Sequence, residues 1–501
     1  MFEAAELGHK VRKHEYEARE PGLRTDLLHA QEALKEANFP VLVLVSGVDG
    51  AGKGDMINQL NAWFDPRDVR GYAFGDPSDE ERERPEYWRF WRALPPKGEI
   101  GLYVGSWYSR PIGDRVANKS TEAELETELA RVNAFEEALI SDGALIIKFW
   151  LHLSKDAQKK RMKKWEKNPA TAWRVTSVDK KHLKLYDHFA SIAERTLRLT
   201  STGQSPWIIV EATDERYRNL TVGQHILDRI NARIRRDAET VAPSSHLRPI
   251  VAPEIGKNVT VLGQLDLSQT ADKSSYKKVL AHHQGRLAKL IRQAREKQVS
   301  SIAVLEGWDA AGKGGLIRRI IPAMDARNYQ IIPIGAPTDE ERAHHYLWRF
   351  WRHIPRAGNV TIYDRSWYGR VLVERIEGFA TRDEWMRAYT EINDFEEQLT
   401  RHGIVVLKFW LHISKDVQLA RFKDREKIPF KRYKITEDDY RNRDKWDDYE
   451  CAVTDMVERT STESAPWNLV EANDKHYARL KALHIYCERM ERVLDKLSGT
   501  A

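Results

Sequence analysis

The chain is poor in the features that mark secreted, membrane-embedded or disulfide-built proteins. It has two cysteines in 501 residues, Cys451 and Cys487, too few for a metal cluster or a disulfide framework. No apolar run approaches the roughly 18 residues that a membrane span requires. The N-terminus, with Glu3, Glu6 and Lys10 close together, lacks the apolar stretch of a signal peptide. We therefore expect a protein of the reducing cytoplasm that has no membrane partner.

The chain also has little net charge. Its 81 basic and 75 acidic residues leave only +6, so total charge says little about partners. The distribution is more informative, because residues 418–434 hold seven Lys or Arg and residues 158–174 also hold seven. A single charge run is usually a solvated helix face. Its recurrence at matching places favours a basic channel for a polyanion, and no nucleic-acid-binding motif accompanies it, so we expect no nucleic-acid partner.

What the chain does contain is a long internal repeat. Adding 260 to the residue number carries Trp88-Arg89-Phe90-Trp91-Arg92 onto Trp348-Arg349-Phe350-Trp351-Arg352, and the register holds without a gap from about residue 40 to 217. The length exceeds what one hydrophobic core usually supports. Between the halves, the proline-containing stretch 236–268 has no helical periodicity. We therefore predict a tandem duplication, with one domain at 1–235, a linker at 236–268 and a second domain at 269–501.

Each half alternates short apolar runs with helical patterns. Thr381 and Glu384 form a capping-box pattern before one such helix, and Thr121 and Glu124 repeat it. This alternation predicts an α/β fold with a parallel sheet covered by helices on both faces. In the second half the predicted strands are 301–306, 330–335, 359–364, 404–412 and 467–471, and the predicted helices are 312–326, 339–353, 381–401, 415–427 and 437–460.

The same glycine-rich loop follows the first predicted strand of each half. The loops read Gly47-Val48-Asp49-Gly50-Ala51-Gly52-Lys53-Gly54 and Gly307-Trp308-Asp309-Ala310-Ala311-Gly312-Lys313-Gly314. A loop of this kind between strand and helix points backbone N–H groups at an anion, and its lysine adds a positive charge. Both loops resemble the Walker A pattern, and they predict phosphate binding at the carboxyl ends of the strands.

Both loops depart from the common pattern in a way that bears on metal binding. Gly54 and Gly314 stand where Ser or Thr usually supplies a hydroxyl to Mg²⁺. Each loop carries an aspartate instead, Asp49 or Asp309. A carboxylate beside bound phosphates is unfavourable unless a cation lies between them, although a role in the turn itself stays open.

A second carboxylate is expected at the end of a neighbouring strand, and only the second half has it. Asp364 and Arg365 close the apolar strand there, whereas Val104 and Gly105 stand in the first half within a retained aromatic frame. The loss of polar groups among retained packing residues indicates that this site in the first half no longer catalyses a reaction. We therefore expect catalysis in the second half.

At these residues the chain resembles the polyphosphate kinase type 2 family. The shared motifs are the Gly-x-x-Asp-x-x-Gly-Lys-Gly loop, Asp-Arg-Ser-Trp-Tyr at 364–368, and a basic segment followed by Trp446-Asp447-Asp448-Tyr449. The resemblance covers most of both halves and, in its two-domain arrangement, is closest to the members that phosphorylate AMP. It implies a P-loop kinase-like fold in each half, a helical basic lid, and Mg²⁺-dependent transfer of the terminal phosphoryl group of polyphosphate to a nucleotide.

The resemblance also implies a role for individual residues. Asp309 and Asp364 would be the metal-binding and catalytic carboxylates, Lys313 the loop lysine, and Arg365 a catalytic contact to phosphate. Further phosphate or polyphosphate contacts are expected at Gly307, Ala310, Ala311, Gly312, Gly314, Arg370, Arg421, Arg425 and Lys427. The partners implied are inorganic polyphosphate and AMP or ADP, which places the chain in nucleotide metabolism.

Several alternatives stay open on the sequence. The acceptor could be ADP, or the enzyme could be a nucleoside monophosphate kinase that uses ATP, although seven cations exceed what one ATP needs. A non-catalytic polyphosphate-binding module is a third reading, which the intact second-half residues disfavour. The oligomeric state is open, a homo-oligomer included. A base-stacking residue is to be sought in an aromatic cluster, although core packing is the favoured role of each member: Tyr346, Trp348, Phe350, Trp351, Trp367 and Tyr368.

Overall fold

The computed structural model describes residues 1–239, 260–427 and 437–499. These residues form two compact units. The first contains most of the first half of the chain together with Asp339–His345, and the second contains Ser78–Trp88 with most of the second half. The predicted linker 236–268 falls mainly on residues 240–259, which lie outside the described part. The final helix of the first half continues to Glu239, and a 3-10 turn spans Leu262–Gln264.

Each unit is built on a five-stranded sheet in which all pairs are parallel, as the sequence predicts. The strand orders are β2-β3-β1-β4-β5 and β7-β8-β6-β9-β10, so the two sheets have the same topology. The strands that carry the glycine-rich loops, β1 and β6, lie at the centre. The strands are β1 Val41–Gly47, β2 Val69–Ala73, β3 Ile100–Val104, β4 Leu145–His152, β5 Trp207–Glu211, β6 Ser301–Gly307, β7 Tyr329–Pro333, β8 Val360–Asp364, β9 Val405–His412 and β10 Trp467–Glu471.

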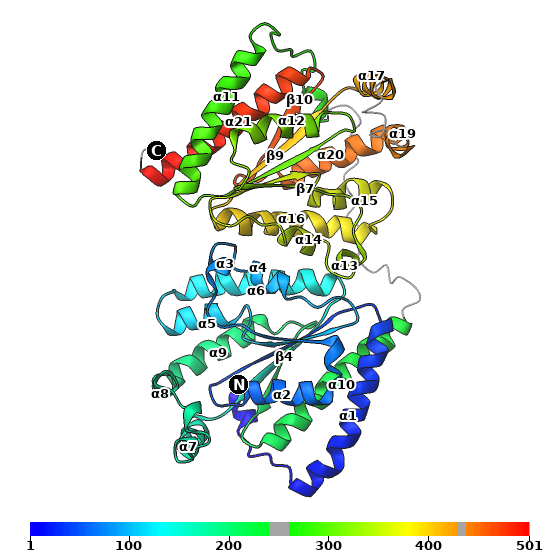
Figure 1. Ribbon diagram of the computed structural model, residues 1–501. Helices are drawn as coiled ribbons and strands as arrows, with labels where there is room; N and C mark the ends of the chain where they lie inside the picture. Colours follow the sequence, from blue (N-terminus) through cyan, green and yellow to red (C-terminus); the bar gives the residue numbers. More distant parts are fainter. Residues whose placement is uncertain (240–259, 428–436, 500–501) are drawn as a thin grey trace. The chain divides into compact units, whose positions relative to one another are not determined.

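Helices pack on both faces of each sheet. In the second unit α11, α12 and α21 lie on one face and α16 lies on the other (Figure 1). None of the described helices combines the length and the apolarity needed to cross a lipid bilayer. The first half contributes α1 Lys13–Glu36, α2 Lys53–Trp63, α3 Asp79–Arg82, α4 Trp88–Arg92, α5 Ser109–Val116, α6 Glu122–Ser141, α7 Lys155–Glu166, α8 Ser177–Lys184, α9 Tyr186–Thr200 and α10 Glu215–Glu239. The second half contributes α11 Tyr276–Glu296, α12 Lys313–Ile320, α13 Asp339–Arg342, α14 Trp348–Trp351, α15 Val373–Ile376, α16 Arg382–Arg401, α17 Lys415–Glu426, α19 Glu437–Asp444, α20 Trp446–Thr460 and α21 Lys475–Ser498.

The predicted helices are right in place but wrong in several boundaries. The helix predicted over 339–353 is two short helices, α13 and α14, separated by a turn. Pro85 occupies the matching position in the first half, where a proline cannot continue a helix, and the second half keeps the same turn with His345. The helix predicted over 437–460 is likewise divided, at Lys445. The long helices α11 and α21 lie outside the predicted set.

Both capping boxes are present. Thr381 Oγ1 accepts a hydrogen bond from the Glu384 N–H, and the Glu384 carboxylate accepts one from the Thr381 N–H at 2.7 Å. Thr121 and Glu124 make the same pair of bonds before α6. The capping boxes start α16 and α6 at the same point of the repeat and so fix where each helix meets its sheet.

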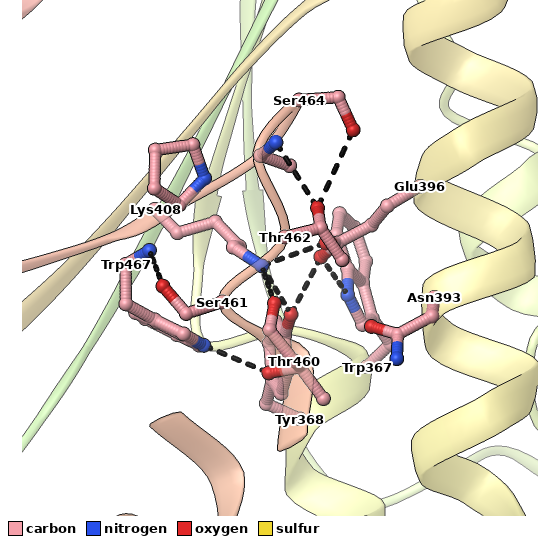
Figure 2. A network of polar contacts seen from close by, with 12 residues as sticks. Trp367, Tyr368, Asn393, Glu396, Lys408, Thr460, Ser461, Thr462, Ser464 and Trp467 are labelled. Carbon is pink, nitrogen blue, oxygen red and sulfur yellow. Dashed lines mark hydrogen bonds and ion pairs between the residues drawn. The ribbon is translucent and has the colours of Figure 1, made fainter. Parts of the chain in front are cut away.

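A buried ion pair joins the sheet of the second unit to the turn after β8 (Figure 2). Lys408, on β9, donates to Glu396 Oε2 at 2.7 Å, to the Tyr368 hydroxyl at 2.9 Å and to the Thr460 carbonyl at 2.6 Å. The Tyr368 hydroxyl and the Trp367 indole N–H both donate to Glu396 Oε1. This network ties the Trp367–Tyr368 turn to α16 and to the end of α20, and it therefore holds the end of β8 in place.

Replacement of Lys408 with Met is expected to lower the free energy of unfolding by about 3 kcal/mol, because removing one partner leaves the buried Glu396 carboxyl uncompensated. The first unit has the same network, in which Lys148 donates to Glu136 at 2.7 Å, so Lys148→Met is a matched control and should cost a similar amount. Urea unfolding followed by intrinsic fluorescence measures both. Unchanged unfolding midpoints in the two variants would show that the network does not stabilise the fold.

Candidate functional site

The glycine-rich loop of the second unit connects β6 to α12, as the sequence predicts. Gly307 has a φ of 145°, and a Cβ on it would lie 2.5 Å from the Leu411 carbonyl oxygen, so only glycine fits where β6 meets the loop. Gly312 has a φ of 117° and Ala310 a φ of 63°, so two further residues have left-handed backbone. This path turns the chain sharply into α12, which begins at Lys313, and the N-terminus of a helix favours an anion.

The loop lysine lies over the loop. Lys313 Nζ donates to the Gly307 carbonyl at 2.6 Å and approaches the Trp308 carbonyl at 3.4 Å. Burial, reinforced by the nearby Arg365 charge, lowers the pKa of Lys313, while Asp309 opposes that shift. The ammonium group is thus positioned where the loop would cradle a phosphate.

Asp309 and Arg365 meet at the mouth of the loop. Arg365 Nη2 donates to Asp309 Oδ1 at 2.9 Å, and Asn442 Nδ2 donates to Asp309 Oδ2 at 3.1 Å. Burial alone would raise the pKa of the Asp309 carboxyl, but the charges of Lys313 and Arg365 outweigh it and hold the pKa below its ordinary value. Asp309 therefore stays ionised beside the loop, which a ligand for a cation must do.

Asp364 ends β8 next to this pair. In the sheet Asp364 lies opposite Leu305 of β6, two residues before Gly307. Arg365 then takes a φ of 67°, and its N–H donates to the Leu305 carbonyl at 3.1 Å, which turns the chain across the carboxyl end of β6. The structure thus brings Asp309, Lys313, Asp364 and Arg365 to one edge of the sheet, although 55 residues separate the first from the third.

Glu306 also belongs to this site, and sequence reasoning missed it. Its side chain is buried before Gly307, where the Ser366 hydroxyl donates to Glu306 Oε1 at 2.8 Å. Burial raises the pKa of the Glu306 carboxyl, while Lys313 and Arg365 oppose the shift. The repeat carried the signal, because the first half has Ser46 at this position and also lacks the aspartate and arginine that follow β8.

The predicted phosphate-binding cations lie in different settings. Arg421 is buried, and its guanidinium donates to the carbonyls of Ala310, Ala311, Ala472 and Asn473. Arg370 pairs with Glu374 at 3.1 Å and lies over the Tyr346 ring. Arg425 is half-buried and Lys427 is exposed near the end of α17. Phosphate contacts by these four side chains remain predictions, and residues 428–434 of the basic segment lie outside the described part.

The aromatic cluster around α14 and the turn after β8 is core. All of its members are buried, with Trp351, Trp367 and Tyr368 at 0% exposure. The aromatic residues at the site itself are others. Trp308 stacks on Trp446 with ring centroids 3.7 Å apart, and Tyr449 lies 6.2 Å from Trp308.

The corresponding place in the first unit has the glycine-rich loop but lacks counterparts of Asp364 and Arg365. Lys53 donates to the Gly47 carbonyl at 2.9 Å, as Lys313 does to Gly307. Asp49 pairs at 2.6 Å with His182, the counterpart of Asn442, and Gly105 stands where the second unit has Arg365. Arg218 packs against Gly52, where a Cβ would lie 1.9 Å from its Nη1 atom, and donates to the Ala51 carbonyl. The first unit therefore keeps the glycine-rich loop and its lysine but not the second carboxylate or the arginine that follows it.

The carboxylates of the second unit suit a divalent cation that is shared with substrate. In the described ranges no three His, Cys, Asp or Glu side chains are arranged to hold a metal alone. Mg²⁺ commonly takes one or two protein carboxylates and completes its shell with water and substrate phosphates. Asp309 and Asp364 match that donor set.

A parallel sheet with a glycine-rich phosphate loop after its central strand defines a P-loop kinase-like domain, present twice here. A family model described as polyphosphate kinase 2 matches residues 10–238 and 270–497. A polyphosphate:AMP phosphotransferase of Pseudomonas aeruginosa is 53% identical over 99% of this chain and all of its own. One of Acinetobacter johnsonii is 37% identical over 95% of this chain and 97% of its own.

A solved structure supports the same assignment. A crystal structure described as a polyphosphate kinase 2 from Pseudomonas aeruginosa PA01 has a TM-score of 0.89 and 51% sequence identity, and it covers 99% of this chain and 100% of its own. The chain belongs to the polyphosphate kinase 2 family. Members of this family generally need a divalent metal ion.

Proposed function

We propose that this protein transfers the terminal phosphoryl group of inorganic polyphosphate to AMP and forms ADP, at the carboxyl end of β6 and β8 in the second unit. It would thus be a phosphotransferase with a phosphate group as acceptor. The full-length relatives named polyphosphate:AMP phosphotransferase support this assignment. The observation that carries it is the Asp309–Arg365 pair at the mouth of the loop, beside Asp364 and Lys313.

The residues of the site suit phosphoryl transfer. Such transfer passes through a loose transition state, so the protein mainly aligns the reactants and neutralises charge. Lys313 and the N–H groups of the loop would hold one phosphate, and Arg365 offers a planar guanidinium for two oxygens of another. Mg²⁺ held by Asp309 and Asp364 would supply positive charge between donor and acceptor phosphates. Arg421 would hold the loop in shape through Ala310 and Ala311.

The test is an assay of the purified protein with AMP and long-chain polyphosphate, without ATP, with and without Mg²⁺. ADP formation that depends on Mg²⁺ is the expected result. Activity with ATP and not with polyphosphate would identify a nucleoside monophosphate kinase instead.

The two thiols are free, which agrees with a reducing compartment, and we place the reaction in the cytoplasm.

AMP is expected to be a better acceptor than ADP. The reason is geometric: if the helical lid expected from the basic segment 418–434 and the loop after β7 leave room for one acceptor phosphate before the metal, the additional phosphate of ADP moves the attacking oxygen out of line. Such misplacement of reacting atoms is costly, on the order of 10²-fold for 1 Å. Comparison of kcat/KM for AMP and ADP at saturating polyphosphate measures the preference. A higher value for ADP would reassign the acceptor and leave the donor unchanged.

A further inference from the structure

A strongly basic surface lies on the first unit, beside its glycine-rich loop. Residues 155–184 form α7, a 3-10 turn at Ala172–Arg174 and α8, and they include eleven Lys or Arg and three Asp or Glu. The matching residues 415–444 of the second half include ten Lys or Arg and seven Asp or Glu. The unit without counterparts of Asp364 and Arg365 therefore carries the higher positive charge in this segment.

The contacts of α7 fix which side of the helix faces solvent. Gln158 Nε2 donates to the Asp49 carbonyl at 2.9 Å. Arg161 Nη1 donates to the Gly50 carbonyl at 2.8 Å, so this side of α7 lies on the loop. The opposite side carries four exposed lysines, which we call the lysine face: Lys159, Lys160, Lys163 and Lys164. α8 packs beside α7 (Figure 1) and adds two further exposed lysines, Lys181 and Lys184.

The four lysines of this face have no acidic partner among the described residues. Lys155 and Lys180 of the same segment do form ion pairs, with Asp187 and Glu166. The spacing of the lysine face places like charges at i and i+4, which destabilises a helix. Cations in the last turn suit the helix dipole, but two of the four lie a turn earlier. A polyanion bound along this face would relieve the repulsion.

The second unit shows that the fold does not require this charge. α17 occupies the place of α7 and keeps the inward contact, because Gln418 donates to the Asp309 carbonyl at 3.2 Å. The counterparts of three of the four lysines are uncharged or acidic: Leu419, Ala420 and Asp424. The lysine face is therefore a feature of the first unit alone.

The chemistry of the face favours a chain of phosphates. Lysine offers a compact charge with three donors and no planar group to match a base. Single-stranded nucleic acids are usually held by stacking of their bases on aromatic side chains as well. Trp173, in the turn between α7 and α8, is 72% exposed and would be the residue for such stacking, so its replacement separates the two kinds of polyanion.

We propose that the lysine face, together with α8, holds long-chain polyphosphate on the first unit without a metal and without transferring phosphate from it. The inference rests on the proposed function, because polyphosphate is the donor of that reaction. Both units belong to one chain, so a long donor held by the first unit reaches the second in an intramolecular step, which raises its effective concentration there. The first unit then retains the donor, and the second transfers its terminal phosphoryl group.

Replacement of the whole lysine face by Gln tests the proposal in the full-length protein. Glutamine forms helices about as well as lysine, so α7 should persist. In EDTA at low salt, the Kd for long-chain polyphosphate should rise about tenfold or more. The slope of log Kd against log salt concentration should fall by about 3, since each phosphate contact contributes about 0.7 to 0.9 in nucleic acids. The variant is Lys159→Gln, Lys160→Gln, Lys163→Gln and Lys164→Gln.

Steady-state rates separate retention from transfer. With AMP and long-chain polyphosphate, the KM for polyphosphate should rise by a similar factor in the four-glutamine variant, while kcat and the KM for AMP stay unchanged. Tripolyphosphate is too short to be held at two sites at once, so with this donor the variant and the wild type should have the same KM and kcat.

Two control variants distinguish a local site from overall charge. Replacing the lysine face by four arginines keeps the charge and should keep the Kd. Removing four exposed charges from α11 lowers the net charge by the same amount and should leave the Kd within about twofold. The α11 control is Lys277→Gln, Lys278→Gln, Lys289→Gln and Arg292→Gln.

A Kd for polyphosphate within about twofold of wild type in the four-glutamine variant, or an equal rise in the α11 control, would overturn the proposal. Binding of single-stranded RNA at least as tight as that of polyphosphate, and weakened by Trp173→Ala, would make the face a nucleic-acid site instead. If the wild type forms no ADP, yet the four-glutamine variant still loses polyphosphate binding, the proposed function fails and the polyphosphate site stands.

Discussion

Replacement of Asp364 with Asn is expected to lower the rate of ADP formation by about 10³-fold or more, which is the scale for a single charged group in a preorganised transfer site. The amide keeps the shape of the side chain but removes the charge. Asp309 alone would then face the cation. Initial rates with AMP and polyphosphate, both saturating, measure the effect.

The repeat provides a control for this variant. Asp49→Asn removes a carboxylate from the loop of the first unit and should leave the rate within about twofold, since Val104 already denies that unit a second carboxylate. Thermal melting of both variants checks that the fold is retained. If Asp364→Asn keeps a tenth or more of the wild-type rate, Asp364 does not hold the metal.

Lys313→Ala is expected to lower the rate by about 10³-fold, whereas Lys53→Ala should change it only a few-fold. The two lysines make equivalent bonds to their loops, to the Gly307 carbonyl at 2.6 Å and to the Gly47 carbonyl at 2.9 Å. The local structural cost of the two changes is therefore similar, and the difference between the two rates isolates the chemistry.

Equal losses in the two lysine variants would contradict the assignment of catalysis to the second unit. Loss of activity in Lys53→Ala alone would reverse it. The double variant adds information, because two independent sites should give multiplicative effects. A double variant no slower than Lys313→Ala would indicate that Lys53 takes no part in turnover.

Some of the site was predictable because its signals are local or repeated. A glycine-rich turn between an apolar run and a helix can be read in one stretch of sequence, and so can Asp364 at the end of a strand. The comparison of the halves showed that Val104 and Gly105 replace the aspartate and the arginine that the second half has at 364 and 365. The same comparison also shows that Ser46 stands where the second half has Glu306. The sequence alone does not reveal that Glu306 belongs to the site, because its contact with Ser366 forms only when the strands of the sheet have assembled.

For other residues the sequence does not give the contacts. Arg421 is expected from sequence to contact phosphate, yet its guanidinium donates to two carbonyls of the loop and to two carbonyls just after β10. Asn442 lies 133 residues after Asp309 and in no motif, and only the packing of α19 over the loop brings the two together. The Trp348–Trp351 aromatics are core, which was their favoured role on the sequence, so the search for a base-stacking residue among them found none.

The sequence by itself determined the duplication, the parallel α/β sheet, the phosphate loops and the half of the chain that carries both carboxylates, because each of these depends on short-range pattern or on register between repeats. The tertiary structure decided which charges neutralise one another. It paired Asp309 with Arg365, buried Glu306 beside Lys313 and turned the lysine face of α7 away from the loop. Those outcomes depend on distances between segments that are far apart in the chain, and a parallel sheet sets such distances only when its strands have assembled.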